Sequence, residues 1–228
     1  MSIEVKNLIK YYGNQAAVND VSFSVKKGEI VGFLGPNGAG KSTTMKIISG
    51  YVPANSGEII VCGMKVDVDN LKTRKLIGYL PENNPLYLDM YVKEYLEFVG
   101  GIYKVKQLNN RVKDMINAVG LDVEQNKKIG ALSKCYRQRV GLAQAIIHDP
   151  EVLILDEPTS GLDPNQLVEI RELITNIGKE KTVMLSTHIM QEVEAICDRI
   201  VIISKGQIVA NDNASSLKKG VDQQTVYV

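Results

Sequence analysis

The stretch Gly35-Pro-Asn-Gly-Ala-Gly-Lys-Ser-Thr43 decides the fold of this chain. Its spacing, a glycine followed by four residues and then Gly-Lys-Ser, is that of a phosphate-binding P-loop. A short apolar run at residues 30–34 precedes it, which indicates a buried strand, and residues 43–49 contain no helix breaker before Gly50. Strand, loop and helix are the context in which this motif binds phosphate. The alternative is a glycine-rich turn with a solvated lysine.

The P-loop predicts binding of a nucleoside triphosphate. Consecutive backbone N–H groups and the positive end of a helix dipole stabilise a polyanion without contributing a full charge. Lys41 would supply a cation to the β- and γ-phosphates, and the Ser42 hydroxyl would ligate Mg²⁺. The loop residues predicted to contact the nucleotide are Asn37, Gly38, Ala39, Gly40, Lys41, Ser42 and Thr43.

Length and composition fit a globular protein of one large domain or two lobes, with 228 residues and 44% hydrophobic content. The net charge of +1 shows no basic bias, so we expect no nucleic-acid partner. The chain lacks a signal peptide and any run of roughly 20 apolar residues, and we expect a cytosolic protein. Its three cysteines, Cys62, Cys135 and Cys197, lack metal-ligand spacing.

The region before the P-loop reads as an antiparallel lobe, because apolar residues alternate with polar ones on both sides of a turn at Gly13 and Asn14. Tyr11 and Tyr12 stand at this turn, where an exposed ring can stack on a flat base. A pair of surface tyrosines fits the sequence equally well.

The middle of the chain, residues 85–150, is predicted to be mainly helical, because apolar residues recur there at helical spacing. We expect these stripes to be core; a partner-binding face is the alternative. Strands are predicted at residues 57–62 and 77–80. From residue 151 strands and helices alternate, at 152–155, 164–177, 182–186, 189–197 and 200–203. Such alternation indicates a parallel sheet covered by helices.

The sequence thus predicts a single α/β P-loop NTPase domain. Residues 1–84 and 151–228 would form the core with its antiparallel lobe, and residues 85–150 a helical lobe.

A second group of candidate residues follows two predicted strands. Asp156 and Glu157 come at the end of the apolar run 152–155, and the carboxyl ends of parallel strands are where ligands bind. Asp156 would hold Mg²⁺, and Glu157 would accept a proton from an attacking water; the alternative is that both begin a polar loop. His188 follows the next strand and is predicted to sense the γ-phosphate. His148 is interpreted as a helix-end residue near the negative dipole.

With these residues the chain resembles the nucleotide-binding subunit of an ABC transporter, in the branch that drives ABC-2-type exporters such as drug-efflux and gliding-motility-associated ATPases. The resemblance runs from the first strand to about Lys219. It depends on Leu132-Ser-Lys-Cys-Tyr-Arg-Gln-Arg139, then Glu157-Pro-Thr, Ser160-Gly-Leu-Asp163 and His188 in the family's order.

The resemblance implies a sandwich dimer in which each ATP lies between the P-loop of one subunit and the signature segment of the other. In that arrangement Ser133 and Cys135 would face the opposing nucleotide, and Asp163 would lie on the loop joining the two sites. Tyr12 would stack on adenine, Glu157 would be the general base, and His188 the switch histidine.

The resemblance also implies two protein partners: a second ATP-binding subunit, identical or different, and a transmembrane subunit on the inner face of the cell membrane. Residues 83–95 would lie nearest the transmembrane subunit, which would also carry the substrate contacts. The sequence ends at Val228, soon after a strand-like stretch at 225–227, and members of this branch often extend beyond such a point; whether this chain does is left open by the sequence.

Two positions depart from the family pattern. Glu82 stands where the family usually has glutamine; it keeps an oxygen ligand for Mg²⁺ but adds negative charge, so we expect altered metal dependence. Cys135 replaces the second glycine of the signature. It would crowd the opposing phosphate, with added strain if its φ is positive; the alternative is that the loop tolerates a small side chain. Cys135→Gly is then predicted to raise ATPase activity.

Two other functions are compatible with the sequence. One is a nontransport ABC protein of a soluble assembly, for which a second cassette or a long coiled-coil insertion would be expected. The other is a regulatory module that binds ATP with little turnover.

Overall fold

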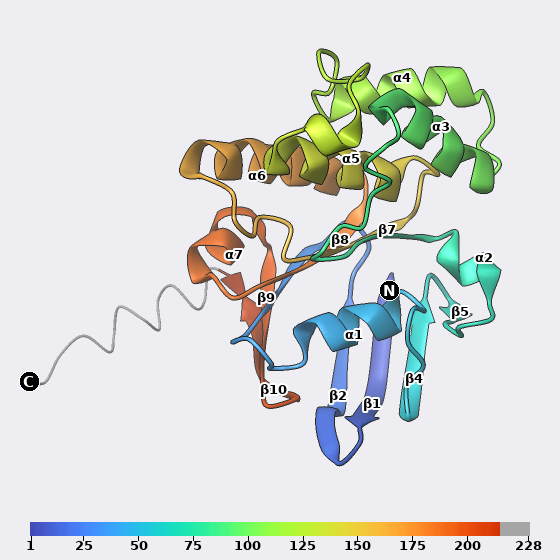
Figure 1. Cartoon of the computed structure of the whole chain (residues 1–228). Coiled ribbons are helices and arrows are strands. Elements are labelled where there is room, and N and C mark those ends of the chain that lie inside the picture. The colour runs from blue at the N-terminus through green and yellow to red at the C-terminus, as the bar shows by residue number, and fades with distance from the viewer. Residues whose placement is uncertain (215–228) are drawn as a thin grey trace, which may run out of the picture.

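The computed structural model describes residues 1–214 (Figure 1). The strand expected at residues 225–227 lies outside the described residues. Two sheets form the frame of the molecule, with helices α3, α4, α5 and α6 gathered at one end and the antiparallel strands at the other (Figure 1). Among residues 1–214, no helix combines the length and the apolar character that crossing a membrane requires.

The smaller sheet is antiparallel, in the order β2-β1-β4-β5. Strands β1 and β2 form the predicted hairpin around Gly13, whose φ is +57°. Alternate residues of both strands are buried, as the sequence pattern predicts. The strand bounds are β1 Ile3–Tyr12, β2 Gln15–Val25, β4 Ser56–Val61 and β5 Met64–Lys65.

The larger sheet has six strands in the order β10-β9-β3-β8-β7-β6, and all neighbours are parallel except β10, which runs antiparallel to β9. Its strands are β3 Ile30–Leu34, β6 Ile77–Leu80, β7 Val152–Asp156, β8 Thr182–Thr187, β9 Arg199–Ser204 and β10 Gln207–Asn213. The P-loop leaves β3 between β8 and β9, so the carboxyl ends of β3, β7 and β8 meet at one edge.

The helices of the chain are α1 Lys41–Ile48, α2 Leu71–Arg74, α3 Val92–Ile102, α4 Leu108–Ala118, α5 Lys134–Ile146, α6 Pro164–Gly178 and α7 Met190–Ile196. Helix α6 begins as its sequence predicts, because the Asp163 carboxylate accepts hydrogen bonds from the backbone N–H groups of Asn165 and Gln166.

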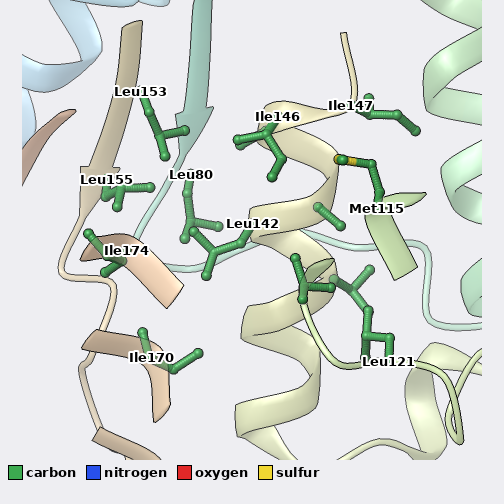
Figure 2. Close-up of a cluster of buried hydrophobic side chains, with 14 of the residues drawn as sticks. Leu80, Met115, Leu121, Leu142, Ile146, Ile147, Leu153, Leu155, Ile170 and Ile174 are labelled. Atoms are coloured by element: carbon green, nitrogen blue, oxygen red, sulfur yellow. The ribbon is translucent and has the colours of Figure 1, made fainter. Parts of the chain in front are cut away.

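Two hydrophobic cores lie on opposite faces of the larger sheet. Leu153 and Leu155 of β7 point into a core shared with the helical region, whereas Val152 and Ile154 point into a core shared with α1 and the smaller sheet. Figure 2 shows the first core, where Leu142 of α5 lies among residues of several elements. Every residue of β7 is buried, because a hydrophobic core covers each face of the sheet there.

Some elements differ from their sequence predictions. Helix α1 begins at Lys41, two residues earlier than predicted, because Gly40 ends the loop in a left-handed conformation with φ +105°. Strands β5 and β10 and helix α2 were not predicted. All three are short or largely exposed, so they carry little hydrophobic periodicity.

Candidate active site

The P-loop wraps around the amino end of α1. Gly38 and Gly40 have positive φ values of +78° and +105°, which glycine adopts without a steric penalty. The loop folds back on the Lys41 side chain, which is 5% exposed. The Lys41 ammonium donates hydrogen bonds to the carbonyl oxygens of Gly35, at 2.8 Å, and Pro36, at 3.2 Å. The loop therefore presents its backbone and a buried cation to the same space.

Asp156 ends β7 and lies beside the P-loop. Its Oδ1 accepts hydrogen bonds from the Ser42 hydroxyl at 2.9 Å and from the Ser186 hydroxyl at 2.6 Å, and its side chain is buried. The structure thus brings together the two predicted metal ligands, Ser42 and Asp156. Sequence reasoning missed Ser186. Ser186 could have been found only from the register between β7 and β8, which places it opposite Asp156.

Glu157 occupies the centre of the site and has a positive φ of +48°. Its N–H donates to the Ser186 hydroxyl at 3.0 Å, which supports this unusual conformation. One carboxylate oxygen, Oε2, lies 3.0 Å from His188 Nδ1. The other, Oε1, lies 3.3 Å from the Lys41 ammonium and has no hydrogen-bond partner within residues 1–214. The three predicted catalytic residues therefore lie together, because Glu157 contacts both Lys41 and His188.

A cleft of ≈ 380 Å³ opens over the P-loop. Tyr12, half exposed, stands at one end of it, and Lys10 Nζ lies 5.3 Å from the centre of its ring. Glu82, which is exposed, lies along the same cleft. Ala39 does not line the cleft, because its side chain is buried in the core beside α1. The lining residues are Tyr12, Gln15, Ala17, Asn37, Gly38, Gly40, Lys41, Ser42, Thr43, Glu82 and Glu157.

Two predicted site residues, Ser133 and Asp163, lie away from this cleft at the starts of helices. Ser133 and Asp163 cap the amino ends of α5 and α6, and both are exposed. The two caps belong to neighbouring segments, because the Lys134 side chain packs against Gly161 in the loop before α6. Within this chain they do not reach the P-loop.

Cys135 departs from the expectation drawn from its sequence position. Its backbone lies in α5 without a positive φ, so it causes no backbone strain. Its side chain is 5% exposed and belongs to the hydrophobic core of the helical region. The expected crowding of an opposing phosphate requires a thiol that faces outward. The burial of this thiol removes the physical basis of that expectation.

His148 follows α5, as predicted, but burial affects the pKa of its imidazole more than the helix dipole does. Its ring stacks on Tyr103, with centroids 3.9 Å apart, and its Nε2 lies 3.2 Å from the Ile77 carbonyl oxygen. Burial lowers the pKa of His148 to about 4, although the Ile77 contact opposes this shift. The imidazole is therefore neutral at pH 7.

Comparisons with known proteins agree with this geometry. Residues 18–160 match the family described as "ABC transporter". The chain is 37% identical to the linearmycin resistance ATP-binding protein LnrL of Bacillus subtilis, over 98% of this chain and 73% of LnrL. It is 36% identical to the bacitracin transport ATP-binding protein BcrA of Bacillus licheniformis, over 95% of this chain and 71% of BcrA.

A solved structure shows the same fold. The dimeric ATP-binding cassette MJ0796, in a post-hydrolysis state bound to ADP and Pi, superposes with a TM-score of 0.84 and 26% identity, over 93% of this chain and 98% of that one. The match extends to the nucleotide-binding half of the molecule and to the helical region alike. The chain therefore belongs to the ABC transporter family, as an ATP-binding subunit that hydrolyses ATP.

Proposed function

We propose that this chain hydrolyses MgATP in the P-loop cleft with Glu157 as the general base, and that a dimer of such subunits drives export through a separate transmembrane subunit. The observation that carries the proposal is the position of Glu157, buried between Lys41 and His188 with one carboxylate oxygen that has no hydrogen bond from the described residues 1–214. A general base needs such an acceptor oxygen within reach of the attacking water.

The nucleotide would lie along the cleft from Tyr12 to Glu157. The N–H groups of the P-loop and the Lys41 ammonium would hold the phosphates. The Tyr12 ring is exposed at the far end of the cleft and would stack on the base, while Lys10 over the ring limits its orientation.

The oxygen groups beside the P-loop fit a magnesium ion. Mg²⁺ takes oxygen ligands, keeps several waters and commonly uses only one or two carboxylates together with substrate phosphates. The Ser42 hydroxyl and the Asp156 carboxylate lie together, and Glu82 faces the same cleft. When bound there, the ion would neutralise charge that develops on the phosphates.

Proton transfer would involve Glu157 and His188. The Glu157 carboxylate would accept the proton of the attacking water, and the His188 imidazole would orient that carboxylate through the contact at Oε2. His188 is exposed enough, at 43% of its side chain, to contact a γ-phosphate as well.

A second ATP-binding subunit would complete each site. Ser133 and Asp163 are exposed, lie outside the cleft and cap neighbouring helices, which fits residues that meet a partner's nucleotide. Cys135 would contribute through its backbone, because its thiol is buried. The dimeric state of the cassette MJ0796 supports this arrangement.

An exposed aromatic cluster supports contact with a transmembrane subunit. Tyr87, Tyr91 and Phe98 are about half exposed, and the Tyr87 ring packs edge-on against Phe98 and Tyr95. Exposed apolar patches on this scale mark interaction sites. The cluster overlaps residues 83–95, which we propose as the segment that docks on the transmembrane subunit. We also propose that the chain forms one ATPase domain, with residues 85–150 as its helical lobe and residues 1–84 and 151–228 as its core.

The relatives support export as the direction of transport. LnrL is named for linearmycin resistance and BcrA for bacitracin transport. We propose an antimicrobial compound as the class of substrate and the inner face of the cell membrane as the place where the subunit works.

Hydrolysis by the purified chain at rising protein concentration tests the proposal, with Glu157→Gln as the control. We expect the rate per subunit to rise with concentration, and we expect Glu157→Gln to bind ATP without hydrolysing it. A control that keeps its turnover would contradict the role of Glu157. ATP binding without turnover by the unaltered chain would favour the regulatory module, and hydrolysis without a membrane partner in the cell would favour a soluble assembly.

A further inference from the structure

Glu192 is a buried carboxylate outside the nucleotide cleft. It lies in the first turn of α7 and is 2% exposed. Its Oε2 accepts a hydrogen bond from the Thr159 hydroxyl at 2.6 Å and another from the Thr187 hydroxyl at 2.7 Å. Its other oxygen, Oε1, is buried and has no hydrogen-bond partner within residues 1–214.

The two threonines belong to the two segments that carry the proposed catalytic pair. Thr159 follows Glu157 after a single proline, and Thr187 directly precedes His188. Beyond the pairing of β7 with β8 and the hydrogen bonds of Ser186, these two segments have two further contacts. They meet at the site through the hydrogen bond between Glu157 and His188, and away from it through Glu192.

The backbone around these contacts leaves little freedom. Thr187 also accepts a hydrogen bond from the Ile189 N–H at 3.1 Å, which fixes the turn that contains His188. On the other side, Pro158 restricts the link between Glu157 and Thr159. A shift of Thr159 would therefore move Glu157, and a shift of Thr187 would move His188.

Stability alone does not explain a carboxylate in this position. Burial of a charged group is costly unless its oxygens are all hydrogen-bonded, and here one oxygen is not. Buried charged groups can often be replaced by apolar side chains of similar volume without loss of stability. The two hydrogen bonds from catalytic segments point instead to a role in the geometry of the site.

We propose that Glu192 is a positioning residue for ATP hydrolysis: by holding Thr159 and Thr187 on one oxygen, it fixes the Glu157 carboxylate relative to the His188 imidazole. The inference rests on the catalytic roles proposed above for Glu157 and His188. It does not require Glu192 to touch ATP, water or a metal ion.

Steady-state kinetics on the whole chain give the first test. Glu192→Leu removes both acceptor interactions, and because small misplacements of catalytic groups are costly, kcat should fall roughly 10- to 100-fold. The KM for ATP should change by less than about threefold, because the cleft residues are untouched. Glu192→Gln keeps an acceptor oxygen and should restore most of kcat. Thr159→Val combined with Thr187→Val should reproduce the loss seen with leucine.

Two variants of the same helix serve as controls. Val193→Ala removes core packing next to Glu192, and Glu194→Gln changes a half-buried carboxylate on the same helix. Both should keep kcat per folded subunit. If Val193→Ala lowers kcat as much as Glu192→Leu does, the effect is general destabilisation and the positioning role is wrong.

The two histidines allow a test that does not depend on turnover. Because the chain has only His148 and His188, its imidazole NMR signals are few and can be assigned with a variant of each. Glu192→Leu, or the milder Thr159→Val if the leucine variant does not fold, should shift the His188 signal and leave the His148 signal in place. An unchanged His188 signal would overturn the inference, whereas a Glu157→Gln variant that still hydrolyses ATP would overturn the proposed base instead.

Discussion

The imidazole Nδ1 of His188 lies 3.0 Å from Oε2 of Glu157, although the two residues directly follow different strands of the larger sheet. A histidine that orients the base should matter for rate more than for binding. We expect His188→Ala to lower kcat by roughly 10²- to 10⁴-fold, the range of a lost acid–base contribution. The KM for ATP should stay nearly constant. A kcat within about threefold of the unaltered chain, measured at saturating MgATP, would contradict this role.

Glu82 gives a prediction about metal dependence. The carboxylate faces the P-loop cleft and places a negative charge near the expected position of the phosphates. Glu82→Gln should raise the Mg²⁺ concentration needed for half-maximal hydrolysis a few-fold, because a neutral amide is a weaker ligand than a carboxylate. The maximal rate should change by less than about threefold. Asp89→Asn, an exposed carboxylate outside the cleft, is the matched control; an equal shift in both variants would exclude a specific role for Glu82.

Cys135→Gly now has the opposite expected outcome from the one based on sequence. The thiol is packed in the core, and glycine adds a helix penalty of roughly 0.5–1 kcal/mol. Together with lost packing we expect about 1–2 kcal/mol of destabilisation and a Tm lower by roughly 3–8 °C. The rate per folded subunit should not rise. Cys135→Ala, measured alongside, separates packing from helix propensity, and a faster glycine variant would restore the crowding hypothesis.

Substitutions in the exposed aromatic cluster of Tyr87, Tyr91 and Phe98 should weaken binding to the transmembrane subunit without slowing ATP hydrolysis. Tyr87→Ser and Phe98→Ser remove aromatic area from the proposed docking surface without touching the P-loop cleft. Basal hydrolysis by the purified chain should be unchanged. Co-purification with the transmembrane subunit should fall at least tenfold, since aromatic anchors dominate such interfaces. Val123→Ser, at an exposed position elsewhere in the helical region, should leave assembly intact.

His148 predicts a loss of stability in mild acid. Its pKa is lowered to about 4 in the folded chain by burial, whereas an unfolded histidine titrates near 6.5. Between these pH values the unfolded state binds more protons than the folded state. The stability that neutral His148 contributes is therefore complete above about pH 6.5 and is lost as the pH falls toward 4. His148→Phe keeps the stack on Tyr103 and removes this titration. Denaturant unfolding of both chains from pH 7 to 4 should show a smaller loss in the variant; parallel curves would contradict the assignment.

Much of the nucleotide-binding framework was predictable, because its signals are local. The strand β3, the P-loop and α1 follow one another within twenty residues, and apolar runs mark β6, β7 and β8. The antiparallel edge strand β10 was not predictable, because only Ile208 and Ala210 in it are half-buried and its other residues are exposed.

The details of the site depend on contacts between distant residues. Ser186 reaches Asp156 only because β7 and β8 pair in one register, which no local pattern encodes. The inward direction of Cys135 depends on how α5 packs in the helical region. Glu192 was not singled out from the sequence, because only the fold brings two threonine hydroxyls to it. Such features arise from tertiary packing and are not present in residue spacing.

The buried ion pair between Lys41 and Glu157 has a consequence for affinity. The Lys41 ammonium lies 3.3 Å from Glu157 Oε1, so phosphate oxygens that bind Lys41 must compete with this internal carboxylate. A phosphate that binds the same ammonium would loosen this contact and leave the Glu157 carboxylate freer to turn toward the attacking water. We therefore expect this ion pair to weaken ATP binding and to restrain the Glu157 side chain until phosphate competes for Lys41.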